Sequence, residues 1–369
     1  MKPSGNPDVG LLVSDRPAAA VGVFTTNRFQ AAPVIVSRKH LRRGSARAIV
    51  CNAGNANACT GTQGIDDATE MARFTSNALR IGGKEKTLVN STGVIGVRLD
   101  VGKVKHGIEL ASKELAPDGA RDFARAILTT DTKPKFAEVR VGGSTVVGFA
   151  KGAGMMAPEL ATMLVFLATD AVVQRDVADA ALRKAVRPSF EALNLDGCMS
   201  TNDTVLLLAN GASGEAVAAD AFEAAVADVC ASLAHMVADD GEGMTKLVTV
   251  TVRGAADPRE ARKAADAIAG SVLLRCALNG ADPYWGRVLA ALGSAKIPLD
   301  PNKVDVWMGG EKLSEAGTFG PGDVEAARTR LKQRNVEIVV ELHRGEAQAT
   351  VYTNDLSVGY VQFNTEYTT

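Results

Sequence analysis

Cysteine and histidine are scarce in this sequence, and their positions exclude several kinds of site. The five cysteines are odd in number and widely scattered, and the four histidines are scattered as well. None of them has the spacing of a metal-binding motif, so a zinc site or a histidine-based catalytic triad is poorly supported. The same pattern argues against a disulfide framework and favours reduced thiols in a cytoplasmic protein.

The sequence also lacks an excess of charge of either sign and any long hydrophobic run. Lysine and arginine total 41 against 42 acidic residues, a net charge of -1, and the basic residues are dispersed. We therefore expect neither a nucleic-acid partner nor a membrane partner. No apolar run approaches the about 20 residues that span a bilayer. Residues 1–20, which include Asp8 and Asp15, do not have the pattern of a signal peptide.

What the chain does have is enough apolar residues for a sizeable core, with 46% hydrophobic content over 369 residues. Short apolar runs alternate with segments of helical spacing, which predicts an α/β fold with mixed sheets covered by helices. Strands are predicted at 21–24, 33–36, 46–51, 88–89, 137–141, 145–150, 163–168, 205–208, 247–252, 336–342 and 349–353. Helices are predicted at 66–81, 120–128, 177–193 with an interruption at Pro188, 222–237 and 257–270. Gly142-Gly143 and Arg344-Gly345 each predict a β-hairpin.

The segment 151–164 suggests a nucleophile. A glycine-rich loop leads to Pro158, and Ala161-Thr162 then stands at the head of the buried strand 163–168. The Thr162 hydroxyl could attack the Ala161 carbonyl, and hydrolysis of the resulting ester would cut the chain. The freed α-amine titrates at about pH 8, so it could act as the base for the hydroxyl. On the residues alone, a threonine packed at the start of a strand is the simpler interpretation.

Other polar segments are candidates for the rest of a site. The loop 51–61 is rich in asparagine and glycine, and 129–134 is a cluster of hydroxyl groups before a proline. A strand that ends at Thr92-Gly93 could supply the hydroxyl and backbone N–H donors of an oxyanion hole. Glu242 lies between two glycines just after the helix 222–237. Each of these segments could equally be an ordinary turn.

The pattern Lys-Gly-x-Gly-Met-x-x-Pro-x-x-Ala-Thr-Met-Leu at 151–164 resembles the self-cleavage segment of the ornithine acetyltransferase family, the ArgJ proteins of arginine biosynthesis. Further likenesses are the asparagine-rich loop 51–61, Asp-Gly-x-x-Ser-Thr-Asn-Asp-Thr at 196–204, and 282–287. In the last of these, Tyr284 stands where the family usually has asparagine. The resemblance extends over nearly the whole chain.

This resemblance implies a layered α-β-β-α sandwich, similar to N-terminal-nucleophile hydrolases but topologically distinct from them. It implies cleavage between Ala161 and Thr162 into an alpha chain, 1–161, and a beta chain, 162–369, interwoven into one catalytic unit. The expected assembly is a heterotetramer of two alpha and two beta chains. The expected reaction moves acetyl from N2-acetyl-L-ornithine to L-glutamate by a ping-pong route.

The resemblance also assigns roles to individual residues. It makes Thr162 the nucleophile and implies that Thr92 and Gly93 hold the oxyanion. The substrate-binding residues that it implies are Thr129, Lys151, Thr162, Glu242, Asn364 and Thr369. A lysine ammonium suits a substrate carboxylate, and a glutamate suits an ammonium group. The polar C-terminal tail is expected to fold over the site.

No metal and no organic cofactor is implied, although acetyl-CoA is a possible second acetyl donor. Three alternatives remain open at this point. The first is a threonine amidase or aminopeptidase that uses water as the acceptor. The second is an acetyltransferase of the same family in specialised metabolism. The third is a binding protein with an inactive site.

Overall fold

The computed structural model describes residues 2, 5–157 and 163–366, and its first seven strands form one sheet. The strand order is β3-β2-β1-β7-β6-β5-β4. The strands are β1 (Val9–Phe24), β2 (Ser45–Asn55), β3 (Thr87–Val94), β4 (Lys135–Val141), β5 (Ser144–Lys151), β6 (Leu164–Thr169) and β7 (Thr204–Ala209). The predicted hairpin at Gly142-Gly143 joins β4 and β5 and is confirmed.

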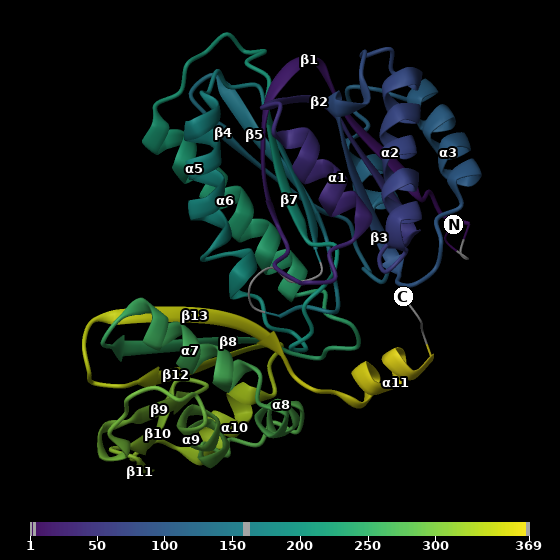
Figure 1. Ribbon diagram of the computed structural model, residues 1–369. Helices are drawn as coiled ribbons and strands as arrows, with labels where there is room; N and C mark the ends of the chain where they lie inside the picture. Colours follow the sequence, from purple (N-terminus) through teal and green to yellow (C-terminus); the bar gives the residue numbers. More distant parts are fainter. Residues whose placement is uncertain (1, 3–4, 158–162, 367–369) are drawn as a thin grey trace.

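The sheet folds over at β1, which arches across its upper end in Figure 1. The first part of β1 pairs with β2, its last residues pair with β7, and the register shifts between Val13 and Ala18. As a result, Ile49 of β2 packs in the same buried cluster as Phe166 of β6 and Leu206 of β7. The two halves of the sheet therefore face each other as two layers.

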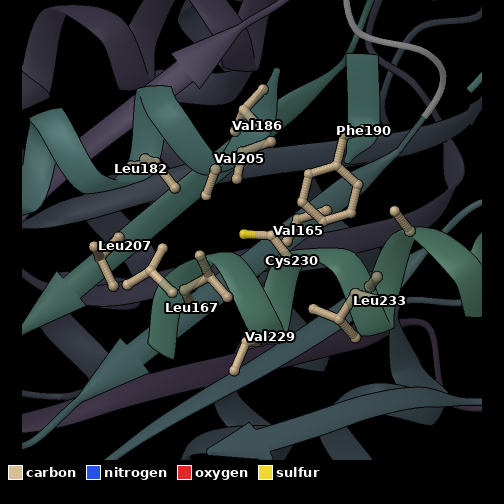
Figure 2. Close-up of a cluster of buried hydrophobic side chains, with 14 of the residues drawn as sticks. Val165, Leu167, Leu182, Val186, Phe190, Val205, Leu207, Val229, Cys230 and Leu233 are labelled. Carbon is tan, nitrogen blue, oxygen red and sulfur yellow. The ribbon is translucent and has the colours of Figure 1, made fainter. Parts of the chain in front are cut away.

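Helices cover the outer face of each layer. They are α1 (Ala32–Leu41), α2 (Gly61–Ala78), α3 (Val101–Lys113), α5 (Arg175–Val186) and α6 (Ala219–Ala238). The short helix α4 (Ala120–Ala126) packs on the inner core instead, where the Phe123 ring contacts Phe149 and Phe166. Val50 and Val89 point away from the inner core and pack with residues of α2 and α3. Val165 and Leu207 point the opposite way, toward α5 and α6 (Figure 2). Figure 1 shows α2 and α3 at one side, α5 and α6 at the other, and the strands between them. This is the predicted α-β-β-α layering.

Helix α6 has the length and composition of a membrane span, and among the helices that the structure describes it alone does. Its apolar residues Phe222, Val226, Val229 and Leu233 are fully buried against the sheet. The helix therefore owes its hydrophobicity to its place in the core, as the spacing of these residues predicts.

A second sheet has the order β11-β10-β9-β12-β8-β13. Its strands are β8 (Leu247–Ala255), β9 (Asp305–Met308), β10 (Glu311–Glu315), β11 (Thr318–Phe319), β12 (Asn335–Glu341) and β13 (Ala347–Asn354). One face packs on α7 (Pro258–Ala269), α8 (Val272–Asn279), α9 (Gly286–Gly293) and α10 (Val324–Leu331). The chain ends in α11 (Val358–Glu366), and single 3-10 turns lie at Lys84–Lys86, Phe190–Ala192 and Pro301–Lys303. Tyr352 of β13 links the second sheet to the helical layer of the first, because it bridges to Leu193 and its ring contacts His235 of α6.

Two local predictions are wrong. The predicted strand 33–36 belongs to α1, because Pro33 occupies the first turn of a helix, where a missing N–H does no harm. The predicted hairpin at Arg344-Gly345 does not form, because β8 lies between β12 and β13 and pairs with both of them. The connecting residues Arg344 and Gly345 instead donate to the Gly254 carbonyl at the end of β8, at 2.6 and 3.0 Å.

Candidate functional site

A polar pocket lies at the end of the sandwich where β3 and β5 end and β7 begins. It is lined by Ala56, Thr92, Gly93, Ile95, Thr129, Thr130, Lys151, Gly154, Met155, Ser200, Thr201, Asn202, Glu242 and Asn364. Every predicted site residue that the structure describes is among them. The remaining predictions, Ala161, Thr162 and Thr369, fall outside the described residues. Segments far apart in the sequence therefore supply one site.

The proposed oxyanion donors lie at the end of β3, where β2 approaches closely. Gly93 has a φ of 130°, and a Cβ atom there would lie 2.3 Å from the carbonyl carbon of Gly54. A side chain at this position would have to push the β2 backbone aside, so glycine is strongly favoured. Thr92 pairs with Ala53 of β2 on the preceding step of the ladder. Thr92 and Gly93 thus line the pocket in succession.

The asparagine-rich loop fastens this edge of the pocket. Asn52 donates to the Asn55 carbonyl at 2.8 Å and accepts from the Ser91 hydroxyl at 2.6 Å. From the opposite layer, Asn202 donates to the carbonyls of Ser91 and Ala56 at 2.7 and 2.8 Å. The side-chain amides therefore tie the two layers together beside Thr92. The expectation that this loop lies near the site agrees with its position.

Lys151, the last residue of β5, is only 2% exposed. Its Nζ donates to the hydroxyls of Thr129 at 2.8 Å and Thr92 at 3.3 Å, and it lies 3.9 Å from a carboxylate oxygen of Asp131. In the sheet Lys151 stands opposite Leu164, the second residue after Thr162 in the sequence. The buried ammonium group thus lies beside the head of the strand where the nucleophile was predicted.

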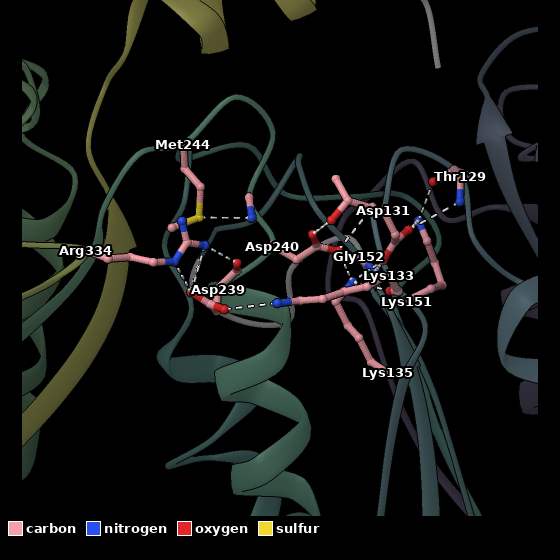
Figure 3. A network of polar contacts seen from close by, with 12 residues as sticks. Thr129, Asp131, Lys133, Lys135, Lys151, Gly152, Asp239, Asp240, Met244 and Arg334 are labelled. Carbon is pink, nitrogen blue, oxygen red and sulfur yellow. Dashed lines mark hydrogen bonds and ion pairs between the residues drawn. The ribbon is translucent and has the colours of Figure 1, made fainter. Parts of the chain in front are cut away.

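Asp131 lies next to the pocket and was not singled out by the sequence analysis, because the segment 129–134 was interpreted through its hydroxyl groups. Its carboxylate accepts from the backbone N–H groups of Gly152 at 2.6 Å and Thr129 at 3.2 Å, and from Lys135 at 2.6 Å (Figure 3). Burial by itself raises the pKa of this carboxyl, but the charges of Lys151 and Lys135 outweigh burial and hold the pKa below its usual range. Asp131 is therefore an anion at neutral pH.

Glu242 also lines the pocket, next to the glycine-rich loop. Its backbone N–H donates to the Ala153 carbonyl at 2.9 Å, and its carboxylate accepts from the Asn364 side chain of α11 at 3.2 Å. A Cβ atom on Gly154 would lie 2.5 Å from this carboxyl group, so the glycine-rich loop leaves the space that Glu242 occupies. Glu242 and Asn364 thus lie side by side at the pocket, and their roles in substrate binding stay predictions.

Two further carboxyl groups flank the predicted cleavage segment. Asp196 accepts from the N–H groups of Met155 and Met156 at 2.6 and 2.7 Å, and Asp203 accepts from that of Met163 at 3.0 Å. Burial raises the pKa of Asp196, and it raises that of Asp203 well above the usual range. The sequence analysis noted the 196–204 motif but gave these side chains no role. The geometry shows that this one loop holds residues on both sides of 158–162.

The site combines hydroxyl groups, a glycine at a strand end and buried charges of both signs. Such a combination is typical of an enzyme that transfers an acyl group between small charged molecules. The comparisons with known proteins agree with this class. The chain belongs to the ArgJ family, whose model matches residues 1–369. The sequence-based assignment to this family is therefore confirmed.

Two relatives carry the name arginine biosynthesis bifunctional protein ArgJ. The protein of Symbiobacterium thermophilum is 47% identical, covering 99% of this chain and 93% of that protein. The protein of Thermus thermophilus is also 47% identical, covering 100% of this chain and 96% of that protein. A solved ArgJ structure from Bacillus halodurans is 33% identical with a TM-score of 0.53, and the match covers 55% of this chain and 98% of that one.

These findings confirm the predicted fold class, the α/β sandwich of the ornithine acetyltransferase type. They also confirm that the chain is an acyltransferase of arginine biosynthesis, a glutamate N-acetyltransferase or ornithine acetyltransferase. The amidase and the alternative of specialised metabolism are not favoured. The roles of single residues, the cleavage and the assembly are questions for the next section.

Proposed function

We propose that this enzyme takes the acetyl group of N2-acetyl-L-ornithine onto Thr162 and passes it to L-glutamate. The observation that carries the proposal is the pocket itself, which is lined by both the buried Lys151 and Glu242. Both substrates carry carboxylate and amino groups, so a pocket with fixed charges of both signs suits them. We assign Lys151 and Thr129 to a substrate carboxylate and Glu242 to the ornithine ammonium, with Asn364 and Thr369 as further contacts.

The chemistry follows a double displacement. The Thr162 hydroxyl attacks the acetyl carbonyl while the Thr162 α-amine takes its proton, and the Thr92 hydroxyl and the Gly93 N–H stabilise the oxyanion. Collapse of this intermediate breaks the amide bond, and ornithine leaves with the proton. The free amine of glutamate then attacks the acetyl ester, which releases N-acetylglutamate and restores the hydroxyl. No step requires a metal or an organic cofactor.

We further propose that the chain cuts itself between Ala161 and Thr162, since the α-amine of Thr162 exists only after that cut. The solved Bacillus halodurans chain supports this proposal, because nearly all of it matches 55% of this chain, close to the share that 162–369 makes up. The strand pairs β1–β7 and β5–β6 each join one strand from 1–161 to one from 162–369. The resulting alpha and beta chains would thus be interwoven.

Three points complete the proposal. The assembly is a heterotetramer of two alpha and two beta chains in the cytoplasm. Acetyl-CoA is a second acetyl donor, in keeping with the word bifunctional in the relatives' names. Light scattering on the purified protein tests the assembly. Acetylation of glutamate with acetyl-CoA in place of acetylornithine tests the second donor.

The decisive experiment measures products. Purified enzyme receives acetylornithine with and without saturating glutamate, and ornithine, N-acetylglutamate and acetate are quantified. We expect ornithine and N-acetylglutamate in equal amounts, with little acetate. Acetate as the main product would mean that water is the acceptor and would replace the transferase by an amidase. Intact-mass spectrometry of the same sample should show two polypeptides, and a single chain that persists on incubation would refute self-cleavage.

A further inference from the structure

Behind the pocket wall lies a buried chain of alternating charges. The Lys135 side chain is fully buried, and its Nζ lies 2.6 Å from Asp131 and 2.6 Å from Asp240. Asp131 in turn faces Lys151 at 3.9 Å. Two carboxylates and two ammonium groups therefore alternate as Asp240, Lys135, Asp131 and Lys151 (Figure 3). Their charges balance, which lets the group persist away from water.

Each carboxylate in this chain also holds backbone that carries a site residue. Asp131 accepts hydrogen bonds from the backbone N–H groups of Thr129, which binds Lys151, and of Gly152, which follows Lys151 in the sequence. Asp240 accepts from the backbone N–H of Thr132 at 3.1 Å and from its hydroxyl. Asp240 lies two positions before Glu242, on the turn that follows α6. The chain of charges thus connects the segments that present Thr129, Lys151 and Glu242.

The distances reveal a competition for Asp131. The Lys135 Nζ lies 2.6 Å from an Asp131 carboxylate oxygen, whereas the Lys151 Nζ lies 3.9 Å from one. The Lys151 Nζ donates instead to the Thr129 and Thr92 hydroxyls. Without Lys135, Asp131 would be left with Lys151 as its ammonium partner among the described side chains. The attraction between two buried opposite charges would then draw the Lys151 ammonium away from the hydroxyls.

We propose that Lys135, together with Asp131 and Asp240, is a positioning device that keeps the Lys151 ammonium on the pocket side and fixes the Glu242 turn. Lys135 touches no substrate in this arrangement and acts through Lys151. The inference rests on the proposed role of Lys151 in substrate binding. It adds a requirement for residues that line no part of the pocket.

The protein offers a matched control, Lys133, two residues before Lys135. Lys133 and Asp239 form a second lysine–aspartate pair between the same two segments, at 3.1 Å, but the Lys133 side chain is 51% exposed. Asp239 also binds Arg334 at 2.9 Å. Because exposed pairs contribute little and this one does not reach Lys151, Lys133→Met should leave the kinetics unchanged.

The test compares Lys135→Met, Lys133→Met, Lys151→Met and the double variant of 135 and 151, each in protein shown by mass to be cleaved. Displacing a group by about 1 Å can cost on the order of 100-fold in rate. We expect Lys135→Met to lower kcat/KM for acetylornithine by about that factor. In the Lys151→Met background, the same change should cost little more, since the group it positions is already gone.

Lys135→Arg and Asp240→Asn cover the case in which Lys135→Met fails to fold. The arginine keeps the charge and should restore part of the lost kcat/KM, whereas the neutral Asn should lower it. Additive losses in the double variant would show that Lys135 does not act through Lys151 and would overturn the inference. Equal losses from Lys133→Met and Lys135→Met would do the same. If Lys151→Met itself keeps normal kinetics, the proposed substrate contact fails, which is a separate outcome.

Discussion

Substituting Gly93 by alanine should separate the oxyanion role from ordinary packing. The added Cβ would lie 2.3 Å from the Gly54 carbonyl carbon and 2.5 Å from the Asn55 nitrogen. Both neighbours are backbone atoms, and ordinary contact begins at 3.4 Å. Strands β2 and β3 must therefore part by about 1 Å at this point. That movement shifts the N–H of residue 93, which is the proposed oxyanion donor.

The magnitude follows from two terms. A non-glycine residue in a sparsely populated backbone region costs about 1–3 kcal/mol, which a domain with about 5–15 kcal/mol of stability survives. Loss of one oxyanion donor lowers kcat by about 100- to 1000-fold. Gly93→Ala should therefore yield a folded protein with a kcat lower by about that factor. KM for acetylornithine should change little, because Lys151 and Glu242 remain in place.

The assay is initial-rate ornithine release, expressed per cleaved enzyme, with thermal unfolding measured in parallel. Gly96→Ala is the matched control, since Gly96 also has a positive φ, 83°, but a Cβ there meets nothing within 4 Å. It should show the backbone strain without the loss of rate. A Gly93→Ala enzyme with near-normal kcat, or equal losses in both variants, would refute the assignment of the Gly93 N–H as an oxyanion donor.

Further variants test the remaining assignments. Thr162→Ala should leave one polypeptide by mass and no acetyl transfer. Lys151→Met removes a buried charged partner, a change that costs about 2–5 kcal/mol in general, so it should raise KM for acetylornithine. Glu242→Gln should raise this KM as well. Normal kinetics in either variant would show that the residue does not bind the substrate. Deleting 364–369 should raise the ratio of acetate to N-acetylglutamate, and an unchanged ratio would show that the tail does not exclude water. Unfolded Asp203 ionises above about pH 3.9, whereas burial raises its folded pKa well above that value. Wild-type stability should therefore fall as pH rises from about 3.9 toward the raised pKa of folded Asp203. Asp203→Asn should then raise Tm more at pH 7 than at pH 4, and equal gains at the two pH values would contradict this.

The sequence predicted those features that depend on local chemistry. The run 163–168 is apolar on both faces, and it forms β6, in the interior of the sheet. The helix 257–270 begins as predicted, because the Asp257 side chain caps the N–H groups of Arg259 and Glu260. The polar segments around Thr92, Thr129 and Glu242 stand out because they interrupt apolar runs. They were recognised as a single site through the family resemblance.

Features that depend on partners distant in the sequence were not predictable in this way. Arg344-Gly345 has the local pattern of a hairpin, and only the insertion of β8 between its flanking strands shows otherwise. In the sequence, Lys135 has the pattern of an exposed lysine at the start of a strand. Its partner Asp240 is 105 positions away, so the neighbouring residues do not indicate that Lys135 is buried and paired. Burial and pairing are properties of the assembled layers, so a pattern of neighbours does not contain them.

The assembled layers also explain how a cut at Ala161-Thr162 can create a site without dismantling it. The backbone of β5 binds that of β6, so Lys151 and Leu164 stay paired whether or not the chain between them is continuous. Downstream of the cut, Met163 is held twice, since its N–H donates to Asp203 and its carbonyl accepts from Thr204 at 3.2 Å. The two fragments share the sheet and the buried clusters on both of its faces. Separating the fragments would expose these apolar side chains to water, which opposes their dissociation. The proposed cleavage would therefore leave the hydrogen bonds on both sides of the cut with their partners.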